Sequence, residues 1–200
     1  CVGMTIPGLP FVALGRNPYL AWGGTNMRAA SSDMVDVSGL PPDSFTVQVD
    51  TIEVRFWPDR EIEVRWSPYG PVMSDVSVIP ADSGELLALR WRGHDPSNDL
   101  EAFLRANRAQ TLEEFVAAFR GYAVSGQNML AVDGDGNTVM TMAVSLPDRP
   151  GVPENFIQRP EDISPAWDRF LEAPDLPIAF NPSEGYIASA NNRPAEHNPP

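Results

Sequence analysis

The chain has 200 residues, of which 42% are hydrophobic and 20% charged, a balance typical of a globular domain and not of a disordered segment. Its 27 acidic residues outnumber its 14 arginines, and without any lysine the formal charge is −13, which disfavours nucleic acid and anionic membranes as partners. The single cysteine, Cys1, excludes an internal disulfide, and no apolar run approaches the roughly 20 residues that span a bilayer.

Strands joined by turns are predicted for the first half of the chain, because 21 prolines and 15 glycines divide it into short segments. Apolar and alternating patterns predict strands at residues 11–14, 20–22, 45–56, 62–66 and 86–91. The first two strands flank a turn at 15–18. The next two form an antiparallel hairpin that turns at 58–60.

Helical patterns are confined to the middle of the chain. Ser97 or Asn98 can cap a helix whose apolar face includes Leu100 and Phe103. Thr111, with Glu114 three residues later, forms a capping box for a second helix.

The last third is predicted to begin with a second hairpin, built from residues 129–132 and 138–144 around a turn at 133–137. Residues 147–177 are rich in proline and are expected to be mostly irregular, with a short helix around 167–171. A final strand at 185–190 leads into Asn191. Together these elements predict one α+β domain, or part of one, over residues 1–200.

Common catalytic and metal-binding signatures are missing. The segment 133–137 begins like a calcium-binding EF-hand loop, but Thr138 and Val144 replace the glycine and glutamate that such a loop needs. His94 and His197 have no metal-ligand spacing, and the chain contains neither a G-x-S-x-G elbow nor a glycine-rich phosphate loop. A hydrolase built on this chain would therefore need another base, such as an α-amino group, whose ordinary pKa is about 8.

Short motifs follow one another in order from Val2 to Pro194. The densest group is Gly3-Met4-Thr5-Ile6-Pro7-Gly8-Leu9-Pro10, Gly15-Arg16-Asn17 and Ala21-Trp22-Gly23-Gly24-Thr25-Asn26, followed by looser motifs at 69–72, 87–91, 114–115, 127–128, 133–137, 147–149, 181–182, 185–187 and 190–194. In order and spacing these motifs resemble the β-chain region of the penicillin acylase family, which belongs to the N-terminal nucleophile hydrolases. The resemblance implies part of an αββα sandwich with mainly antiparallel strands and a few short helices.

The resemblance also implies roles for individual residues. Asn191 is expected to donate its side-chain amide N–H, and Asn26 its backbone N–H, to the oxyanion of a tetrahedral intermediate. Such donors contribute about 3–4 kcal/mol each. Read without the resemblance, Asn191 is a turn-forming residue after a strand. Met27 and Arg28 are expected to line the acyl pocket, with a solvated side chain as the alternative for Arg28.

Many members of the family bind calcium just after this strand. Here Asp33 and the carbonyl of Ser32 match, but Ala30 stands where a carboxylate is expected. Because losing a carboxylate weakens a site for a hard cation, the resemblance implies no required cofactor and, for structural calcium, only a weakened site.

The implied activity is hydrolysis of a linear amide, such as a β-lactam antibiotic side chain or an acyl-homoserine lactone, through an acyl-enzyme. In the family the nucleophile stands well before the Pro-Gly-x-Pro turn, whereas Cys1 lies only six residues before Pro7. We therefore expect Cys1 to be an ordinary strand residue, and the nucleophile to be absent from a chain that is incomplete at both ends. The alternatives are a cysteine-type hydrolase that uses Cys1 and a non-catalytic binding module.

As partners the resemblance implies a small-molecule amide substrate and a helical α-chain cut from the same precursor. The chain by itself is therefore expected to be inactive. The resemblance to the family also implies a periplasmic or extracellular location.

Overall fold

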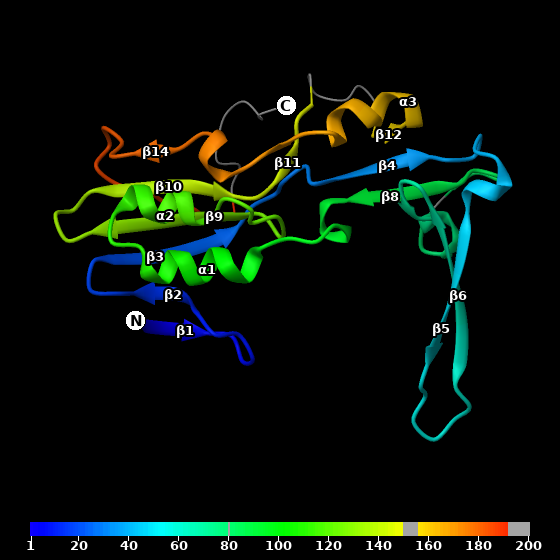
Figure 1. Cartoon of the computed structure of the whole chain (residues 1–200), viewed down its shortest axis with the longest axis horizontal. Helices are drawn as coiled ribbons and strands as arrows, with labels where there is room; N and C mark the ends of the chain where they lie inside the picture. Colours follow the sequence, from blue (N-terminus) through cyan, green and yellow to red (C-terminus); the bar gives the residue numbers. More distant parts are fainter. Residues whose placement is uncertain (80, 150–155, 192–200) are drawn as a thin grey trace.

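The computed structural model describes residues 1–79, 81–149 and 156–191, and the largest sheet in these residues has six strands (Figure 1). In the order β1-β2-β3-β9-β10-β14, its strands are β1 (Val2–Thr5), β2 (Val12–Arg16), β3 (Leu20–Asn26), β9 (Gln127–Asp133), β10 (Thr138–Ala143) and β14 (Ala179–Phe180). All neighbouring strands of this sheet are antiparallel. The longest ladder joins β3 to β9, from the Leu20–Asp133 pair to the Asn26–Gln127 pair.

Two helices, α1 (Asp99–Arg108) and α2 (Leu112–Ala118), cover one face of this sheet (Figure 1). The predicted capping box of α2 is confirmed in part: the Thr111 hydroxyl accepts a hydrogen bond from the Glu114 N–H, but the Glu114 carboxylate reaches back to the N–H of Gln110. Asn98 occupies the N-cap position of α1 without a capping side-chain bond.

The core between sheet and helices is built around two fully buried rings, Phe115 and Phe119. Trp22 of β3 packs against Phe115 with ring centroids 6.4 Å apart, and the two phenylalanines meet edge to face at 5.3 Å. Even-numbered residues of β3 face the helices because successive side chains of a strand alternate between faces. Odd-numbered residues such as Thr25 therefore face the opposite side of the sheet.

Two asparagines fasten the helices to the sheet. The side chain of Asn107 pairs with Val12 as a peptide group would, accepting from its N–H at 2.8 Å and donating to its carbonyl at 2.9 Å. Asn17 donates to the Ala109 carbonyl at 2.7 Å and accepts from the Leu20 N–H at 2.8 Å. These bonds fix the β2–β3 turn against the connection between α1 and α2.

Smaller sheets occupy the rest of the molecule. A three-stranded sheet contains β12 (Ile157–Gln158), β4 (Ser32–Asp36) and β8 (Leu87–Trp91), another contains β5 (Thr46–Ile52), β6 (Arg60–Ser67) and β7 (Gly70–Pro71), and β11 (Leu146–Pro147) pairs with β13 (Phe170–Leu171). Short helices link them: η1 (Pro42–Ser44), η2 (Met73–Asp75), η3 (Arg92–His94), α3 (Pro160–Ile163), η4 (Ser164–Trp167) and η5 (Ala173–Asp175). No helix of the described residues is long and apolar enough to cross a membrane.

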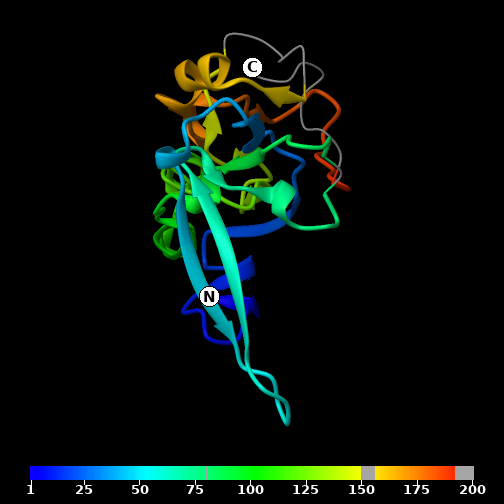
Figure 2. The same ribbon diagram turned by 90° about the vertical axis from the view of Figure 1, so that its right-hand side faces the viewer.

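The hairpin of β5 and β6 projects away from the rest of the described chain (Figures 1 and 2). It was predicted, but its turn lies earlier than expected, with the Trp57 N–H bonded to the Val54 carbonyl at 3.0 Å. Val47 and Val49, which lie on one face of the alternating pattern, are both more than half exposed on this hairpin.

Two predicted elements near the end of the chain are wrong. Residues 170–171 form strand β13 where a helix was expected, and the short helix η4 comes before it. Residues 185–190 form no strand. Their backbone follows a turn in which the Gly185 N–H bonds the Pro182 carbonyl, and Ser189 then contacts the sheet through its side chain. Strand β4 was not predicted, because its residues lack a buried alternating pattern. Strand β1 begins at Val2, directly after Cys1, which the resemblance implied to be a strand residue.

We expect Phe119→Ala to lower the free energy of unfolding of the full-length protein by about 3–5 kcal/mol, because it empties a fully buried ring site. Urea unfolding followed by circular dichroism measures the change. Leu100→Ala is the control, since Leu100 is 52% exposed on α1, and it should change stability by no more than about 0.5 kcal/mol. Equal effects of the two substitutions would contradict this assignment of the core.

A second prediction concerns Tyr122, whose hydroxyl donates to the Ser125 carbonyl at 2.9 Å. Burial, aided by the charge of Asp99, raises its pKa from 10.0 to about 12. Because the folded state holds the phenol proton more tightly, this stabilisation is complete below pH 10 and is lost as the pH rises towards 12.

The free energy of unfolding should therefore fall more steeply between pH 10 and pH 12 in the wild type than in Tyr122→Phe. Urea titrations at several alkaline pH values measure this slope. Tyr19→Phe, which changes a half-exposed tyrosine, should leave it unaltered. Identical slopes for wild type and Tyr122→Phe would refute the assignment.

Candidate functional site

Strand β3 ends at Asn26 with its backbone N–H turned away from β9. In an antiparallel ladder the N–H groups of alternate residues bond to one partner strand. Because the Met27 N–H bonds the Gly126 carbonyl at 2.9 Å, the N–H of the preceding residue, Asn26, points the other way. The N–H of Asn26 therefore points to the β2 side, where the β2–β3 ladder contains only the Gly15–Trp22 and Arg16–Ala21 pairs. The exposed side chain of Asn26 accepts a hydrogen bond from Gln127 Nε2 at 3.0 Å.

Asn191 lies in a segment that returns to the same end of β3. Ser189 Oγ lies 2.6 Å from Thr25 Oγ1 and accepts a hydrogen bond from Asn128 Nδ2 at 3.2 Å. Thr25 and Asn128 are a cross-strand pair on the face of the sheet opposite the helices. The structure thus brings together the segments that contain Asn26, one residue after Thr25, and Asn191, two residues after Ser189.

Asn191 is exposed, and its φ of 60° is in the left-handed region. This conformation costs an asparagine less than most residues, because a short polar side chain tolerates it. The chain therefore changes direction at Asn191, immediately after the contact of Ser189 with the sheet. The remaining residues of the motif at 190–194, from Asn192 to Pro194, lie outside the described residues.

The two residues predicted to line an acyl pocket differ in environment. Met27 is buried in an apolar cluster, and Arg28 is exposed. The cluster that contains Met27 consists of Met27, Met142, Val144, Leu146 and Leu176, with Ala29 and Leu171 packed against it. A buried apolar cluster thus begins directly after Asn26.

Cys1 lies at the opposite end of the sheet from Asn26. It precedes the Val2–Arg16 pair, and Arg16 in turn pairs with Ala21 near the start of β3. Asn26 lies five residue steps beyond Ala21 along the strand, about 17 Å at the usual rise of 3.4 Å per residue. The thiol of Cys1 contacts the carbonyl of Asn107 at 3.3 Å.

The predicted metal-binding residues lie at the start of β4. Asp33 Oδ2 accepts hydrogen bonds from Arg149 Nη2 at 2.8 Å and from Trp167 Nε1 at 2.7 Å. Ser32 is exposed and pairs with Trp91 of β8. Within the described ranges, no three His, Cys, Asp or Glu side chains gather as a metal site.

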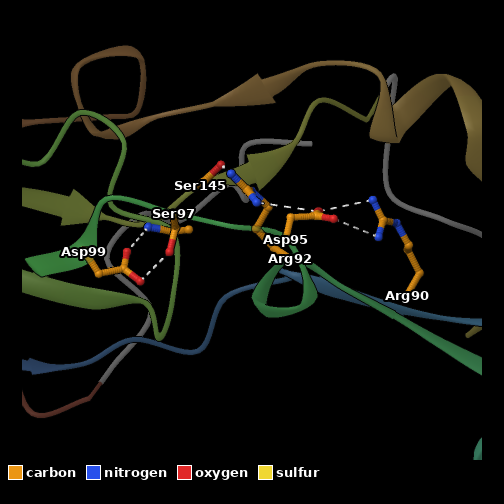
Figure 3. Close-up of polar contacts among 7 residues, drawn as sticks. Arg90, Arg92, Asp95, Ser97, Asp99 and Ser145 are labelled. Atoms are coloured by element: carbon orange, nitrogen blue, oxygen red, sulfur yellow. Dashed lines mark hydrogen bonds and ion pairs between the residues drawn. The ribbon is translucent and has the colours of Figure 1, made fainter. Parts of the chain in front are cut away.

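A group of arginines beside Asp33 escaped the sequence analysis. Figure 3 shows Asp95 between Arg90 and Arg92, with ion-pair distances of 3.2 Å and 3.5 Å. Arg92 also donates to Ser145 Oγ at 3.3 Å (Figure 3). The spacing Arg-x-Arg-x-x-Asp was the available signal, but the aromatic partners come from a distant segment. Arg90 lies over the ring of Trp167 at 4.5 Å, and Arg92 lies over Phe170 at 4.8 Å.

His94 lies between Arg92 and Asp95 in the sequence and packs edge to face against Trp66 and Trp91, with centroid distances of 5.6 Å and 5.3 Å. Burial lowers its pKa, and the charge of Arg90 lowers it further. The imidazole is consequently neutral at pH 7 and fills space between two tryptophans.

Comparison with known proteins gives consistent results. The sequence profile of the family described as penicillin amidase matches residues 1–200. The acyl-homoserine lactone acylase QuiP of Pseudomonas syringae pv. syringae (strain B728a) is 26% identical over 207 residues, which cover 96% of this chain and 24% of that protein. The penicillin acylase 2 proenzyme of Pseudomonas sp. (strain SE83) is 23% identical over 210 residues, 96% of this chain and 26% of that protein.

Among solved structures, the thermostable penicillin G acylase from Alcaligenes faecalis superimposes with a TM-score of 0.77 and 24% identity, covering 97% of this chain and 36% of that chain. This likeness, with the mainly antiparallel sheets and short helices, confirms the predicted α+β fold class. The chain spans about a quarter of the length of the curated relatives it matches. Because the family profile extends over all 200 residues, the chain belongs to the penicillin amidase family.

Proposed function

We propose that this chain is part of an acylase that hydrolyses a linear amide between an acyl group and an amine. The observation that carries the proposal is the contact of Ser189 with Thr25 and Asn128. It holds the segment before Asn191 against the end of the strand that carries Asn26. This contact supports the proposal that the amide donors of Asn26 and Asn191 act at the same end of the sheet.

In the proposed mechanism these amides bind the oxyanion. When a nucleophile attacks the substrate carbonyl, its oxygen gains negative charge, and donors fixed in advance stabilise that charge without reorganising. The Asn26 N–H is directed away from the β9 ladder, and Asn191 follows two residues after the Ser189 contact. Each donor is expected to contribute about 3–4 kcal/mol to the transition state.

The nucleophile is assigned to the full-length protein outside this chain. Cys1 lies at the far end of β3 from Asn26, at a distance no side chain bridges. The matched relatives are about four times as long as the stretch aligned here, and one of them is named a proenzyme. A terminal nucleophile activated by its own α-amino group, on a polypeptide that also supplies a helical α-chain, fits this arrangement.

The proposed substrate has an acyl group with an apolar part. Support for this comes from the buried apolar cluster that begins at Met27, directly after Asn26, and from the exposed Arg28, which can meet a polar group. Relatives are named for penicillin and for acyl-homoserine lactones, and both are amides of an acyl chain with a small amine. These two classes are the substrates to test first, and the proposed reaction requires no cofactor.

Replacing Asn191 by Ala in the full-length protein should lower kcat by about 10²–10³-fold with little change in KM, because the lost donor acts in the transition state. Steady-state hydrolysis of penicillin G and of N-acyl-homoserine lactones provides the measurement.

Asn191→Gly is the matched variant, since glycine keeps the φ of 60° while removing the amide. It should be as slow as Asn191→Ala. Tyr186→Phe, at an exposed tyrosine five residues earlier, should retain wild-type kcat. An active Asn191→Gly variant would remove Asn191 from the mechanism, and a protein that only binds its ligand would be indifferent to both changes.

Ser189 is proposed as a positioning residue for Asn191. Ser189→Ala removes the contacts with Thr25 and Asn128, so we expect kcat to fall by about tenfold, the equivalent of one hydrogen bond of about 1.4 kcal/mol.

Ser189→Thr keeps the hydroxyl and should restore most of the rate. Thermal melting must show that both variants remain folded, and their KM values should stay close to wild type. If Ser189→Ala and Ser189→Thr lose activity equally, the hydroxyl does not position the oxyanion donors.

A further inference from the structure

Arg149 places a positive charge in a nearly closed site at the start of β4. Its side chain is 6% exposed and that of Asp33 is 11% exposed. The guanidinium donates from Nη1 to the Ala30 carbonyl at 2.9 Å and from Nη2 to Asp33 Oδ2 at 2.8 Å. One planar group thus reaches two acceptors, a carbonyl and a carboxylate, in residues 30–33.

The oxygen atoms at this site do not fit the requirements of a calcium ion. Asp33 Oδ2 already accepts hydrogen bonds from Arg149 and from Trp167 Nε1, and residue 30 contributes no carboxylate because it is alanine. A divalent cation bound at this carboxylate would lie beside a fixed guanidinium, where burial strengthens the repulsion between like charges. Calcium also prefers six to eight oxygen ligands.

We propose that the guanidinium of Arg149 takes the place of a bound cation at this site. The folded conformation at the start of β4 then does not require calcium. A bound cation would attract oxygen ligands from separate segments. The guanidinium does the same, because it ties residues 30–33 to the segment that follows β11 (Leu146–Pro147). The forked geometry of arginine suits this role, since its two N–H ends bind different acceptors at once.

Trp167 extends the same site to a third segment. Its indole N–H binds Asp33, and its ring faces the Arg90 guanidinium at 4.5 Å. Arg90 stands opposite Asp33 in the β4–β8 ladder and pairs with Asp95. The charged groups therefore alternate in sign in the order Arg149, Asp33, Arg90 and Asp95. Each of the two arginines has a carboxylate partner.

The test is thermal unfolding of the full-length protein with excess EDTA or with added CaCl₂. Wild type should give the same Tm in both solutions. Arg149→Met should lower Tm by several degrees because it leaves the Asp33 carboxylate buried without its partner. Arg149→Lys, which keeps the charge but loses the fork, should lie between wild type and Arg149→Met.

A second measurement addresses the metal directly. Terbium is a luminescent probe for calcium sites. If terbium bound at Asp33, the neighbouring Trp167 would sensitise its emission. Terbium emission should therefore be the same in wild type and in Trp167→Phe. The double variant Ala30→Asp/Arg149→Met should gain terbium emission and a Tm that rises with CaCl₂.

The proposal would be overturned by either of two results. One is terbium emission from wild type that is lost in both Asp33→Asn and Trp167→Phe. The other is an Arg149→Met variant as stable as wild type in EDTA. Neither readout depends on hydrolysis, so the outcome is independent of the proposed catalytic function.

Discussion

The ladder between β3 and β9 is the constraint on which the rest of the structure depends. Its seven pairs run from Leu20–Asp133 to Asn26–Gln127. This register sends Trp22 and Ala131 towards the helices, and it sends Thr25 and Asn128 to the opposite face, where Ser189 meets them. A shift of one residue would exchange the faces, and the core and the contact with Ser189 would be lost together.

The same ladder brings together the two ends of a long segment of the chain. Between Asn26 and Gln127 lie the β4–β8 sheet, the projecting hairpin and both helices that cover the main sheet. Closing so long a loop costs conformational entropy, which local contacts must offset. Asn17 and Asn107 help to do so, because each joins the helical connection to β2 or β3 through two or more hydrogen bonds.

The sequence predicted elements whose stabilising contacts are local. Thr111 and Glu114 lie one helical turn apart, and the turn between β9 and β10 is held by Asp133, which accepts hydrogen bonds from the N–H groups of Asp135 and Asn137. Such contacts can be read from spacing alone. Segment 185–190 could not be predicted in this way, since its apolar residues suggest a strand while Ser189 binds the sheet through its side chain.

Family motifs supplied the candidate site, but they did not supply its neighbours. Asn26 and Asn191 were singled out by resemblance, whereas Ser189, Gln127 and Arg149 act through partners more than 60 residues away. Spacing in a single sequence carries no information about such contacts. The structure is therefore most informative about which side chains hold the candidate residues in position.

The arginines of this acidic protein are used internally as well as at its surface. Despite a net charge of −13, Arg149, Arg90 and Arg92 are directed into the protein, where Asp33 and Asp95 neutralise them. The proposed oxyanion donors are, in contrast, neutral amides, whose ability to donate does not change across the physiological pH range. Any titration of the proposed hydrolysis near neutral pH would consequently belong to the nucleophile and its base, because the amide donors proposed for this chain do not titrate in that range.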